Sequence, residues 1–209
     1  MSPENPTVFI VDDDVSVLRS LSRLMRQVDY EPRTFASAEE FLSSPDAGLA
    51  NSCLVLDLRM PGLGGLELQR KLASVPASCP VIFISGDGDI PSSVQAMKQG
   101  AVTFLSKPFE NEDLLKAIDE ALEVHRRSMI ARKGKDAILE RIRDLTERER
   151  DVMSHVISGE LNKQIAFHLG ISENTVKIHR GRVMAKMNVV SVAELVRHCE
   201  QAGFQAASI

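Results

Sequence analysis

Short apolar runs alternate with amphipathic stretches over the first half of the chain. The runs are four or five residues long, the second being the weakest, and they occur at 8–11, 32–35, 53–56, 81–84 and 102–105. Runs of this length that are apolar on both faces are typical of parallel strands covered by helices on two sides. The stretches between them, such as 17–28, repeat apolar residues with the spacing of a helix that buries one face. Five strand-helix units predict an α/β domain with a five-stranded, doubly wound parallel sheet.

A helical pattern continues past the last predicted strand, becomes strongly charged at 126–135 and resumes at Ile138. Gly134 weakens a helix by about 1 kcal/mol relative to alanine, which favours a bend or hinge there. One straight helix over 110–142 would instead span about 50 Å and hold its two ends well apart. We therefore predict a first domain over 1–121, a largely helical linker over 122–143 and a second domain over 144–209.

The remainder of the chain shows only helical patterns. Thr146 and Glu149 have the spacing of a capping box, so a helix is expected to begin after Thr146. Further helices are predicted at about 162–169, 173–187 and 191–202. The second domain is therefore predicted to be all-α, with four helices.

Composition narrows the class of protein. The chain is 44% hydrophobic and 26% charged, as in an ordinary globular protein. No apolar run approaches the ~18 residues of a membrane span, and the N-terminus lacks the features of a signal peptide, so we expect a cytoplasmic protein with no membrane partner. Cys53, Cys79 and Cys199 are odd in number and far apart, which favours reduced thiols over disulfides or a zinc site.

The charge is unevenly divided between the two halves. Residues 1–121 hold 10 Lys and Arg against 18 Asp and Glu, whereas residues 122–209 hold 15 against 11. A basic half is the minimum requirement for contact with nucleic acid, although such an excess is as often only a solvated surface. We expect the two halves to meet different partners.

Polar side chains follow four of the five predicted strands. Asp12 and Asp13 follow the first strand, Asp57 ends the third, Ser85 ends the fourth and Lys107 follows the fifth. Ligands of open α/β sheets bind at the carboxyl ends of the strands, so these groups are expected to converge. Each has an ordinary explanation by itself, since Asp57, for example, can initiate a turn. Together the carboxylates repel one another unless a cation neutralises them.

Mg²⁺ is the cation that suits this set of groups, because it takes carboxylate oxygens, a carbonyl, waters and a phosphate oxygen. A carboxylate in such a pocket can attack phosphorus and form an acyl phosphate. Asp57 is the predicted nucleophile because it stands alone at the end of a central strand, whereas Asp12 and Asp13 form a metal pair. Lys107 and Ser85 would contact the phosphoryl oxygens. The proline after Lys107 predicts a fixed turn, of the kind in which cis bonds occur.

These motifs resemble the receiver domain of bacterial response regulators, which has a flavodoxin-like fold. The resemblance rests on the segments 10–14, 56–62, 84–86 and 104–109, which carry the family's motifs in the family's order. It implies that Asp12 and Asp13 bind Mg²⁺, with Asp13 the closer ligand. It also implies that Asp57 both ligates the ion and takes a phosphoryl group from a cognate sensor histidine kinase. The backbone carbonyl of Arg59 would complete the protein ligands.

The resemblance further implies a switch pair, Ser85 and Phe104. The family often has Thr and Tyr at these positions, so a hydrogen bond from a tyrosine hydroxyl is absent here and switching must rest on packing. Phe104 as a plain core residue is the alternative. The hypothesis is that phosphorylation draws Ser85 toward the phosphoryl group, lets Phe104 move inward and remodels the surface of 89–121. That surface then either pairs with another receiver or releases the second domain.

The stretch 164–176 predicts a helix-turn-helix. Ala166 permits close crossing of the helices, Gly170 suits the left-handed end of the first helix, and Ser172 caps the second. The expected shared core consists of Ile165, Leu169, Ile171, Val176 and Val183. The second helix has a basic side formed by Lys177, Arg180, Arg182 and Lys186. Such a side suits DNA phosphates, although a merely solvated helix face is the alternative.

The segment 142–204 is similar to the LuxR-type DNA-binding domain. Together with the preceding receiver, it makes the whole chain resemble the NarL/FixJ class of response regulators, and FixJ-like regulators most closely. The similarity lies at 145–149, Gly159, 162–166, 171–179 and 186–187. It implies that the third of four helices enters the major groove. The expected groove-facing residues are Lys177, Ile178, Gly181 and Arg182, and the expected phosphate contacts are Lys163, Thr175 and Lys186.

The resemblance implies a phosphorylation-dependent transcriptional regulator that binds double-stranded promoter DNA as a homodimer. We expect an activator that contacts RNA polymerase and has no enzyme activity beyond its own phosphoryl uptake and slow autodephosphorylation. One alternative is a phosphatase of the haloacid dehalogenase type, in which Asp12 rather than Asp57 is the nucleophile. Another is a phosphorylation-independent interaction module whose second domain binds protein.

Overall fold

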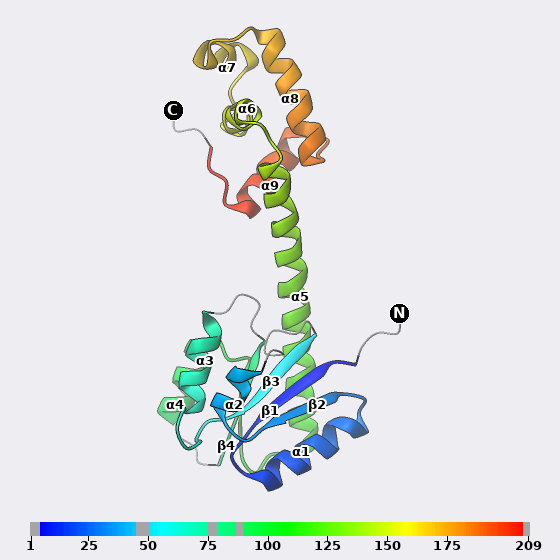
Figure 1. Cartoon of the computed structure of the whole chain (residues 1–209), viewed down its shortest axis with the longest axis vertical. Coiled ribbons are helices and arrows are strands. Elements are labelled where there is room, and N and C mark those ends of the chain that lie inside the picture. The colour runs from blue at the N-terminus through cyan, green and yellow to red at the C-terminus, as the bar shows by residue number, and fades with distance from the viewer. Residues whose placement is uncertain (1–4, 45–50, 75–78, 87–89, 207–209) are drawn as a thin grey trace. The chain divides into compact units, whose positions relative to one another are not determined.

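Two compact units make up the chain. The computed structural model describes residues 5–44, 51–74, 79–86 and 90–206, and it divides into Met1–Met129 and Ile130–Ile209. Figure 1 shows a sheet flanked by helices in the first unit and helices alone in the second. This architecture confirms the predicted combination of an α/β domain with an all-α domain.

The first unit contains a five-stranded sheet whose strands are all parallel. Its strands are β1 (Thr7–Val11), β2 (Glu31–Phe35), β3 (Ser52–Asp57), β4 (Val81–Ser85) and β5 (Thr103–Ser106). They lie in the order β2-β1-β3-β4-β5, so the chain reverses its direction of winding between β1 and β3. Ligands of doubly wound sheets bind at that reversal, beyond the carboxyl ends of the strands.

Five helices accompany the strands: α1 (Val15–Gln27), α2 (Ala38–Ser43), α3 (Gly65–Ala73), α4 (Ile90–Lys98) and α5 (Asn111–Arg143). One buried cluster joins one face of the sheet to α1 and α5, for example through Leu21 and Ile118. A second cluster joins the other face to α2, α3 and α4, through Phe41, Leu68 and Ala96. The sheet is therefore covered on both sides, which is why its central strands β1, β3 and β4 are buried throughout and mostly apolar.

The two edge strands differ from the expectation of burial on both faces. Residues of β2 and β5 are partly or fully exposed, whereas those of β1, β3 and β4 are buried throughout. An edge strand has a neighbour on one side only, so it tolerates polar side chains and a proline. Pro32 accordingly lies within β2, paired with Val8 of β1.

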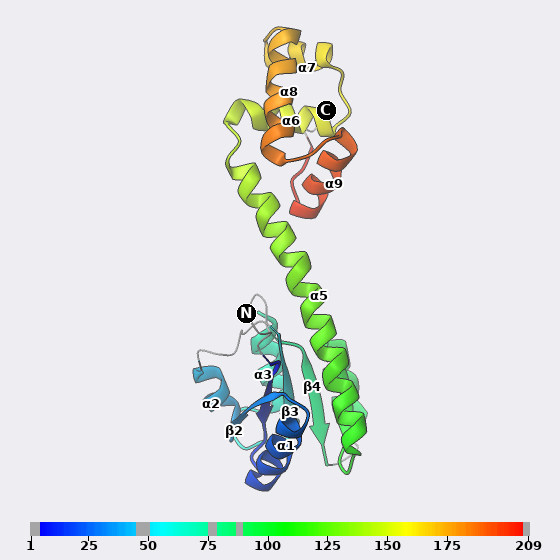
Figure 2. The same cartoon turned by 90° about the vertical axis from the view of Figure 1, so that its right-hand side faces the viewer.

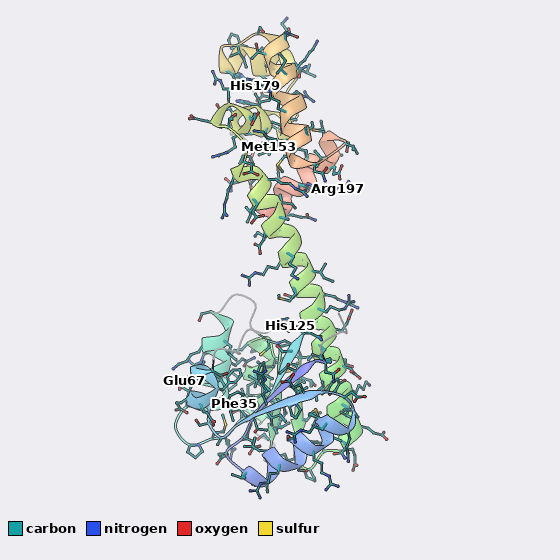
Figure 3. All side chains as sticks on the ribbon, turned by 45° about the vertical axis from the view of Figure 1, so that its right-hand side comes forward. Phe35, Glu67, His125, Met153, His179 and Arg197 are labelled. Atoms are coloured by element: carbon teal, nitrogen blue, oxygen red, sulfur yellow. The ribbon has the colours of Figure 1, made fainter. Side chains whose placement is uncertain are left out.

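Helix α5 is continuous through Gly134, so the hinge favoured there is not formed, and the helix takes up the whole segment predicted as a linker, 122–143. Its residues serve both cores: Leu122 and His125 are buried in the first unit, and Ile138 and Ile142 in the second. Figure 3 labels His125 on this helix. The first core therefore extends past residue 121, and the second begins before residue 144.

The second unit completes the chain with α6 (Glu147–Ile157), α7 (Asn162–Leu169), α8 (Glu173–Met187) and α9 (Val192–Ala202). Figures 1 and 2 show these helices from two sides. They pack around one core, in which Met153, labelled in Figure 3, is fully buried. Thr146 and Glu149 form the predicted capping box at the start of α6. The three cysteines are buried free thiols. Among the described residues, no helix combines the length and apolarity that crossing a membrane requires.

Candidate functional site

The strand register brings the predicted acidic residues to one edge of the sheet. Val11 is paired with Leu56, so Asp12 follows β1 beside the point where Asp57 ends β3. Asp57 is in turn paired with Ile84, and Ser85 of β4 with Ser106 of β5. Asp12, Asp57, Ser85 and Lys107 therefore occupy adjacent positions on four neighbouring strands.

Lys107 joins the two buried carboxylates. Its Nζ lies 2.7 Å from Oδ2 of Asp12 and 2.8 Å from Oδ1 of Asp57. The side chain of Asp12 is 2% exposed and that of Asp57 is 9% exposed, so both charges are almost withdrawn from solvent. The peptide bond between Lys107 and Pro108 is cis, one of the forms that the sequence suggested for this turn.

Backbone amides satisfy the remaining carboxylate oxygens. The amide of Asp14 donates to Oδ1 of Asp12 at 2.9 Å, and the amide of Arg59 donates to Oδ2 of Asp57 at 2.7 Å. Gly65, at the start of α3, lies directly behind Asp57. A Cβ at that position would sit 2.4 Å from the carbonyl oxygen of Asp57, so the strand end and α3 approach as closely as they do only with glycine there.

The pKa values of Asp57 and Lys107 are shifted by burial and by the ion pair between them. Burial raises the pKa of Asp57 above its ordinary value, although the ammonium of Lys107 and the Arg59 amide oppose the shift. Burial by itself would lower the pKa of Lys107, but its hydrogen bonds to Asp12 and Asp57 outweigh that effect and the pKa is raised. Lys107 is therefore held as a cation between the two carboxyl groups.

The three consecutive aspartates have different surroundings. Asp12 is buried in the ion-pair cluster, whereas Asp13 is exposed at the same strand end. Asp14 caps α1, because its Oδ1 accepts from the amide and the hydroxyl of Ser16 at 2.7 and 2.6 Å. Those bonds lower the pKa of Asp14. Asp14 therefore has a structural role as the N-cap of α1, and Asp12 and Asp13 remain as the candidate metal ligands.

The donor set at this edge fits a hard divalent ion. Asp12, Asp13 and Asp57 bring three carboxylates to one region, and Lys107 is the cation that ion-pairs with two of them among the described residues. One ammonium leaves an excess of negative charge. Carboxylate oxygens and the backbone carbonyl of Arg59 are the ligands that Mg²⁺ prefers.

The predicted switch pair occupies neighbouring strands, with Ser85 at the carboxyl end of β4 and Phe104 two register positions back on β5. Ser85 is 2% exposed at the carboxyl end of β4. Phe104 is paired with Phe83 in the sheet, is partly exposed and packs against the cluster that includes Leu68 and Ala96. The packing role of Phe104 is thus present in the structure, and its switch role stays a prediction.

The predicted helix-turn-helix is formed by α7 and α8. Gly170 ends α7 in the left-handed conformation with φ of 64°, and the hydroxyl of Ser172 caps α8 by accepting from the amide of Thr175. The predicted shared core is confirmed, with Ile165, Val176 and Val183 buried and Leu169 and Ile171 packed beside them.

Most of the predicted DNA contacts are exposed. Lys177, Ile178, Gly181 and Arg182 lie on the exposed part of α8, and Lys163 is exposed on α7. The face that the sequence predicted to be basic and groove-facing is therefore available to a ligand.

Three basic or hydroxyl side chains of this region contact the domain itself. Nζ of Lys186 lies 2.6 Å from Oε2 of Glu149 and 3.1 Å from the carbonyl oxygen of Asp144. The hydroxyl of Thr175 is 2.8 Å from that of Ser172. Nη1 of Arg180 donates to Oδ1 of Asn162 at 2.7 Å, which ties α8 to the start of α7.

The sequence did not indicate these contacts, and Lys186 had been predicted as a phosphate contact only. The partners of Lys186 and Arg180 are 37 and 18 residues away along the chain, so no local spacing links them. A buried acid in a capping box, such as Glu149, was the one available signal that a cation would be needed nearby.

Comparison with known proteins agrees with both parts of this description. Residues 8–119 match the response regulator receiver domain family, and residues 143–199 match the family of bacterial regulatory proteins of the luxR type. The chain belongs to the response regulators. Its receiver is followed by a LuxR-type DNA-binding domain, as the sequence predicted.

Similar proteins match over nearly the whole length. Nodulation protein W of Bradyrhizobium diazoefficiens is 48% identical, over 95% of this chain and 87% of that protein. Transcriptional regulatory protein FixJ of Rhizobium meliloti is 43% identical, over 95% and 97%. The low-resolution structure of response regulator StyR is 46% identical, with a TM-score of 0.81 over 94% of this chain and 99% of that one. This response regulator therefore shares the two-domain organisation of transcriptional regulators in two-component systems.

Proposed function

We propose that Asp57 accepts a phosphoryl group from a cognate sensor histidine kinase, in a site completed by Mg²⁺. The observation that carries this proposal is the convergence of two buried carboxylates on the ammonium of Lys107, at 2.7 and 2.8 Å. A phosphoryl group that joins Asp57 would remain within reach of that ammonium, which would then stabilise the added negative charge.

The transfer is a nucleophilic displacement at phosphorus. An oxygen of Asp57 forms a bond to phosphorus while the bond from phosphorus to the histidine nitrogen of the kinase breaks, and the leaving nitrogen keeps the electron pair. The ionised form of Asp57 is the nucleophile, and the ammonium of Lys107 and the Arg59 amide stabilise that form against the opposing effect of burial, which raises the pKa of Asp57. Its side chain is also more accessible than that of Asp12, at 9% against 2% exposed, which favours Asp57 over Asp12 as the nucleophile.

Mg²⁺ would be held by Asp12, Asp13, Asp57 and the backbone carbonyl of Arg59, and it supplies charge neutralisation at the phosphoryl oxygens when bound. Asp13 suits this role because it is exposed at the strand end, free to turn toward an ion. Ser85, buried at the end of β4, would donate its hydroxyl to a phosphoryl oxygen, and Phe104 would follow it inward.

The output we propose is phosphorylation-dependent dimerisation and binding of promoter DNA, with the regulator acting as an activator that contacts RNA polymerase. A dimer binds two half-sites in one event, which raises its affinity for a two-fold operator. The exposed basic side of α8 supports DNA as the ligand. The protein would work in the cytoplasm, where promoter DNA and the catalytic part of a sensor kinase are found. Phosphoryl uptake onto Asp57 and slow hydrolysis of the acyl phosphate would be its only enzymatic activities.

Chemical mapping of the modified residue tests the acceptor. The full-length protein is treated with acetyl phosphate and Mg²⁺, the acyl phosphate is reduced with borohydride, and the labelled peptide is identified by mass spectrometry. Label on Asp57 is expected. Label on Asp12 would instead indicate phosphatase-type chemistry, and absence of any label would contradict the proposal.

Salt-dependent DNA binding separates the regulator from a protein-binding module. Beryllofluoride with Mg²⁺ should convert the protein to a dimer in analytical ultracentrifugation and increase its affinity for its own promoter region. The affinity should fall as salt increases, by about one unit of logarithmic slope for each phosphate contact. Equal binding with and without beryllofluoride would contradict coupling of the two domains.

A further inference from the structure

Three metal-ligating side chains meet at the corner between α6 and α7 in the DNA-binding unit. Nδ1 of His155, on α6, lies 2.8 Å from Oε1 of Glu160, in the turn. Nδ1 of His168, near the end of α7, lies 2.9 Å from Oε2 of the same carboxylate. The candidate ligand atoms of the three residues all lie within 4.8 Å of one another. We call this group the corner cluster.

The carboxylate of the corner cluster is enclosed between its two histidine partners. The side chain of Glu160 is 7% exposed, and its ion-pairing partners within the described ranges are the two histidines. Hydrogen bonds from His155 and His168 lower the pKa of Glu160, which keeps it ionised. A divalent cation held among the three groups would neutralise this enclosed carboxylate and accept the lone pair of each Nδ1 atom.

We propose that the corner cluster binds a divalent transition-metal ion of the Zn²⁺ type. Two imidazole nitrogens and one carboxylate oxygen are a usual protein ligand set for zinc, with water in the fourth position. A tetrahedral ion with bonds of about 2.0–2.1 Å requires ligand atoms somewhat over 3 Å apart. The separations of 2.8 and 2.9 Å between the Nδ1 atoms and the carboxylate oxygens must therefore lengthen slightly to admit the ion.

The side chains allow that movement. His168 is 43% exposed, so its ring can turn without displacing the core, whereas His155, 17% exposed, and Glu160 are held more firmly. The two rings lie with their centroids 5.5 Å apart and their planes 32° from each other, so both Nδ1 atoms already face the same carboxylate.

When the metal ion binds, it replaces the Nδ1 protons that bridge the two histidine rings and the carboxylate of Glu160. In each neutral imidazole the proton moves from Nδ1 to Nε2 through solvent, and the Nδ1 lone pair becomes the metal ligand. A ring that begins as an imidazolium releases one proton. Affinity should therefore fall in acid, as for other histidine sites.

The bound ion would fasten α6 to the first helix of the helix-turn-helix. Residue Asn162 of α7 already holds Arg180 of α8 at 2.7 Å, so α7 carries the contacts that orient the DNA-facing helix. A ligand that binds only the folded unit stabilises it by mass action. Zn²⁺ is accordingly expected to raise the unfolding temperature of the DNA-binding unit, independently of any phosphorylation at Asp57.

Metal titration of the full-length protein tests the site. Co²⁺ is added as a spectroscopic substitute and Zn²⁺ is followed by calorimetry, with Mg²⁺ in excess so that the receiver carboxylates are occupied. The wild-type protein should bind one equivalent and give the visible absorption of tetrahedral cobalt. His168→Gln should weaken binding by about tenfold or more, and Glu160→Gln likewise, because each removes a ligand.

His198→Gln serves as the matched control, since His198 lies on α9 outside the corner cluster and the variant should bind as the wild-type protein does. Circular dichroism checks that each variant is folded, and a Zn²⁺-dependent rise in the unfolding temperature should be present in the wild type and lost in His168→Gln. Equal metal affinity in wild type and His168→Gln would overturn the proposal, as would failure of the folded wild-type protein to bind Zn²⁺.

Discussion

The strand-end site of the receiver and the exposed side of α8 present charge in opposite ways. In the receiver, the carboxylates of Asp12 and Asp57 are buried and share one ammonium, that of Lys107. On α8, the side chains of Lys177 and Arg182 are exposed. The receiver charges stabilise one another inside the fold, whereas the charges of Lys177 and Arg182 face solvent, where an external partner can contact them.

This difference determines how function responds to change. Electrostatic interactions are stronger where water is excluded, so each member of a buried cluster depends on the others. Exposed charges are screened and act nearly independently, and each contributes a similar small share to binding. We therefore expect all-or-none effects at the receiver site and graded effects on α8.

Replacement of the acceptor should have the largest effect. Asp57→Asn removes the carboxylate nucleophile, and an amide does not form an acyl phosphate, so uptake from acetyl phosphate should be abolished. Intact-protein mass spectrometry measures the added phosphoryl group. Glu67→Gln, at an exposed acid of α3 in the same unit, should retain full uptake. Phosphorylation of the Asn variant would show that Asp57 is not essential, and the receiver site would then not differ from α8 in the way described above.

Loss of the shared cation should have the next largest effect. Lys107→Ala leaves two buried carboxylates without their ammonium, which should destabilise the receiver by about 1–3 kcal/mol in denaturant unfolding. Added Mg²⁺ should restore part of this loss, and removal of Mg²⁺ with EDTA should reverse the gain. Lys116→Ala, at an exposed lysine of α5, should change stability little. Equal stability of the two variants would show that the receiver charges do not depend on one another.

A single substitution on α8 should act more weakly. Lys177→Ala should reduce promoter affinity by about fivefold, roughly 1 kcal/mol, and lower the salt slope by about one unit. Binding is measured by fluorescence anisotropy at several salt concentrations. Lys135→Ala, at an exposed lysine of α5, is the control that should leave both quantities unchanged. Complete loss of binding in Lys177→Ala would show that the effects of substitutions on α8 are all-or-none, as expected for the receiver site, and not graded.

The ion pair between Glu149 and Lys186 should show the smallest effect, in the stability of the DNA-binding unit. The hydrogen bond from Lys186 lowers the pKa of Glu149 below 4.5, so the pair stabilises the fold above that pH. The stabilisation is lost as pH falls through the lowered pKa of the folded state. Glu149→Gln keeps the capping-box acceptor and should cost about 1 kcal/mol at neutral pH.

Acid unfolding of the Gln variant sharpens this measurement. The difference in unfolding free energy between wild type and Glu149→Gln should shrink as pH falls below 4.5, since protonation removes the same charge. A difference that stays constant with pH would show that the neutral contact, and not the charge, stabilises the pair.

Local sequence patterns predicted the helices and their ends well where these depend only on residues close in the chain. The capping box at Thr146, the helices α7 and α8, and the glycine at the end of α7 all lie where their residues indicated. These features depend on neighbours within four residues, so the chain carries the information in its spacing. The edge strand β2 was predicted least clearly because its exposed position removes the need for apolar residues.

For the receiver site, the sequence predicted which residues lie at the strand ends but not how their side chains are arranged. Their convergence followed from the parallel sheet, but the assignment of partners did not. Nothing in the chain indicated that Lys107 would divide its hydrogen bonds between Asp12 and Asp57. Nothing in it indicated that Gly65 would be needed for the close approach of α3.

By itself the sequence determined the two domain types, the acids and lysine at the strand ends, and a basic side on one helix, because periodicity and caps depend on residues close in the chain. Only the tertiary structure decided which charges meet. Lys107 is 95 residues from Asp12 and 50 from Asp57, and Lys186 is 37 from Glu149. Contacts over such separations arise from packing of whole elements, and burial then makes a few of them strong and leaves the exposed ones for a ligand.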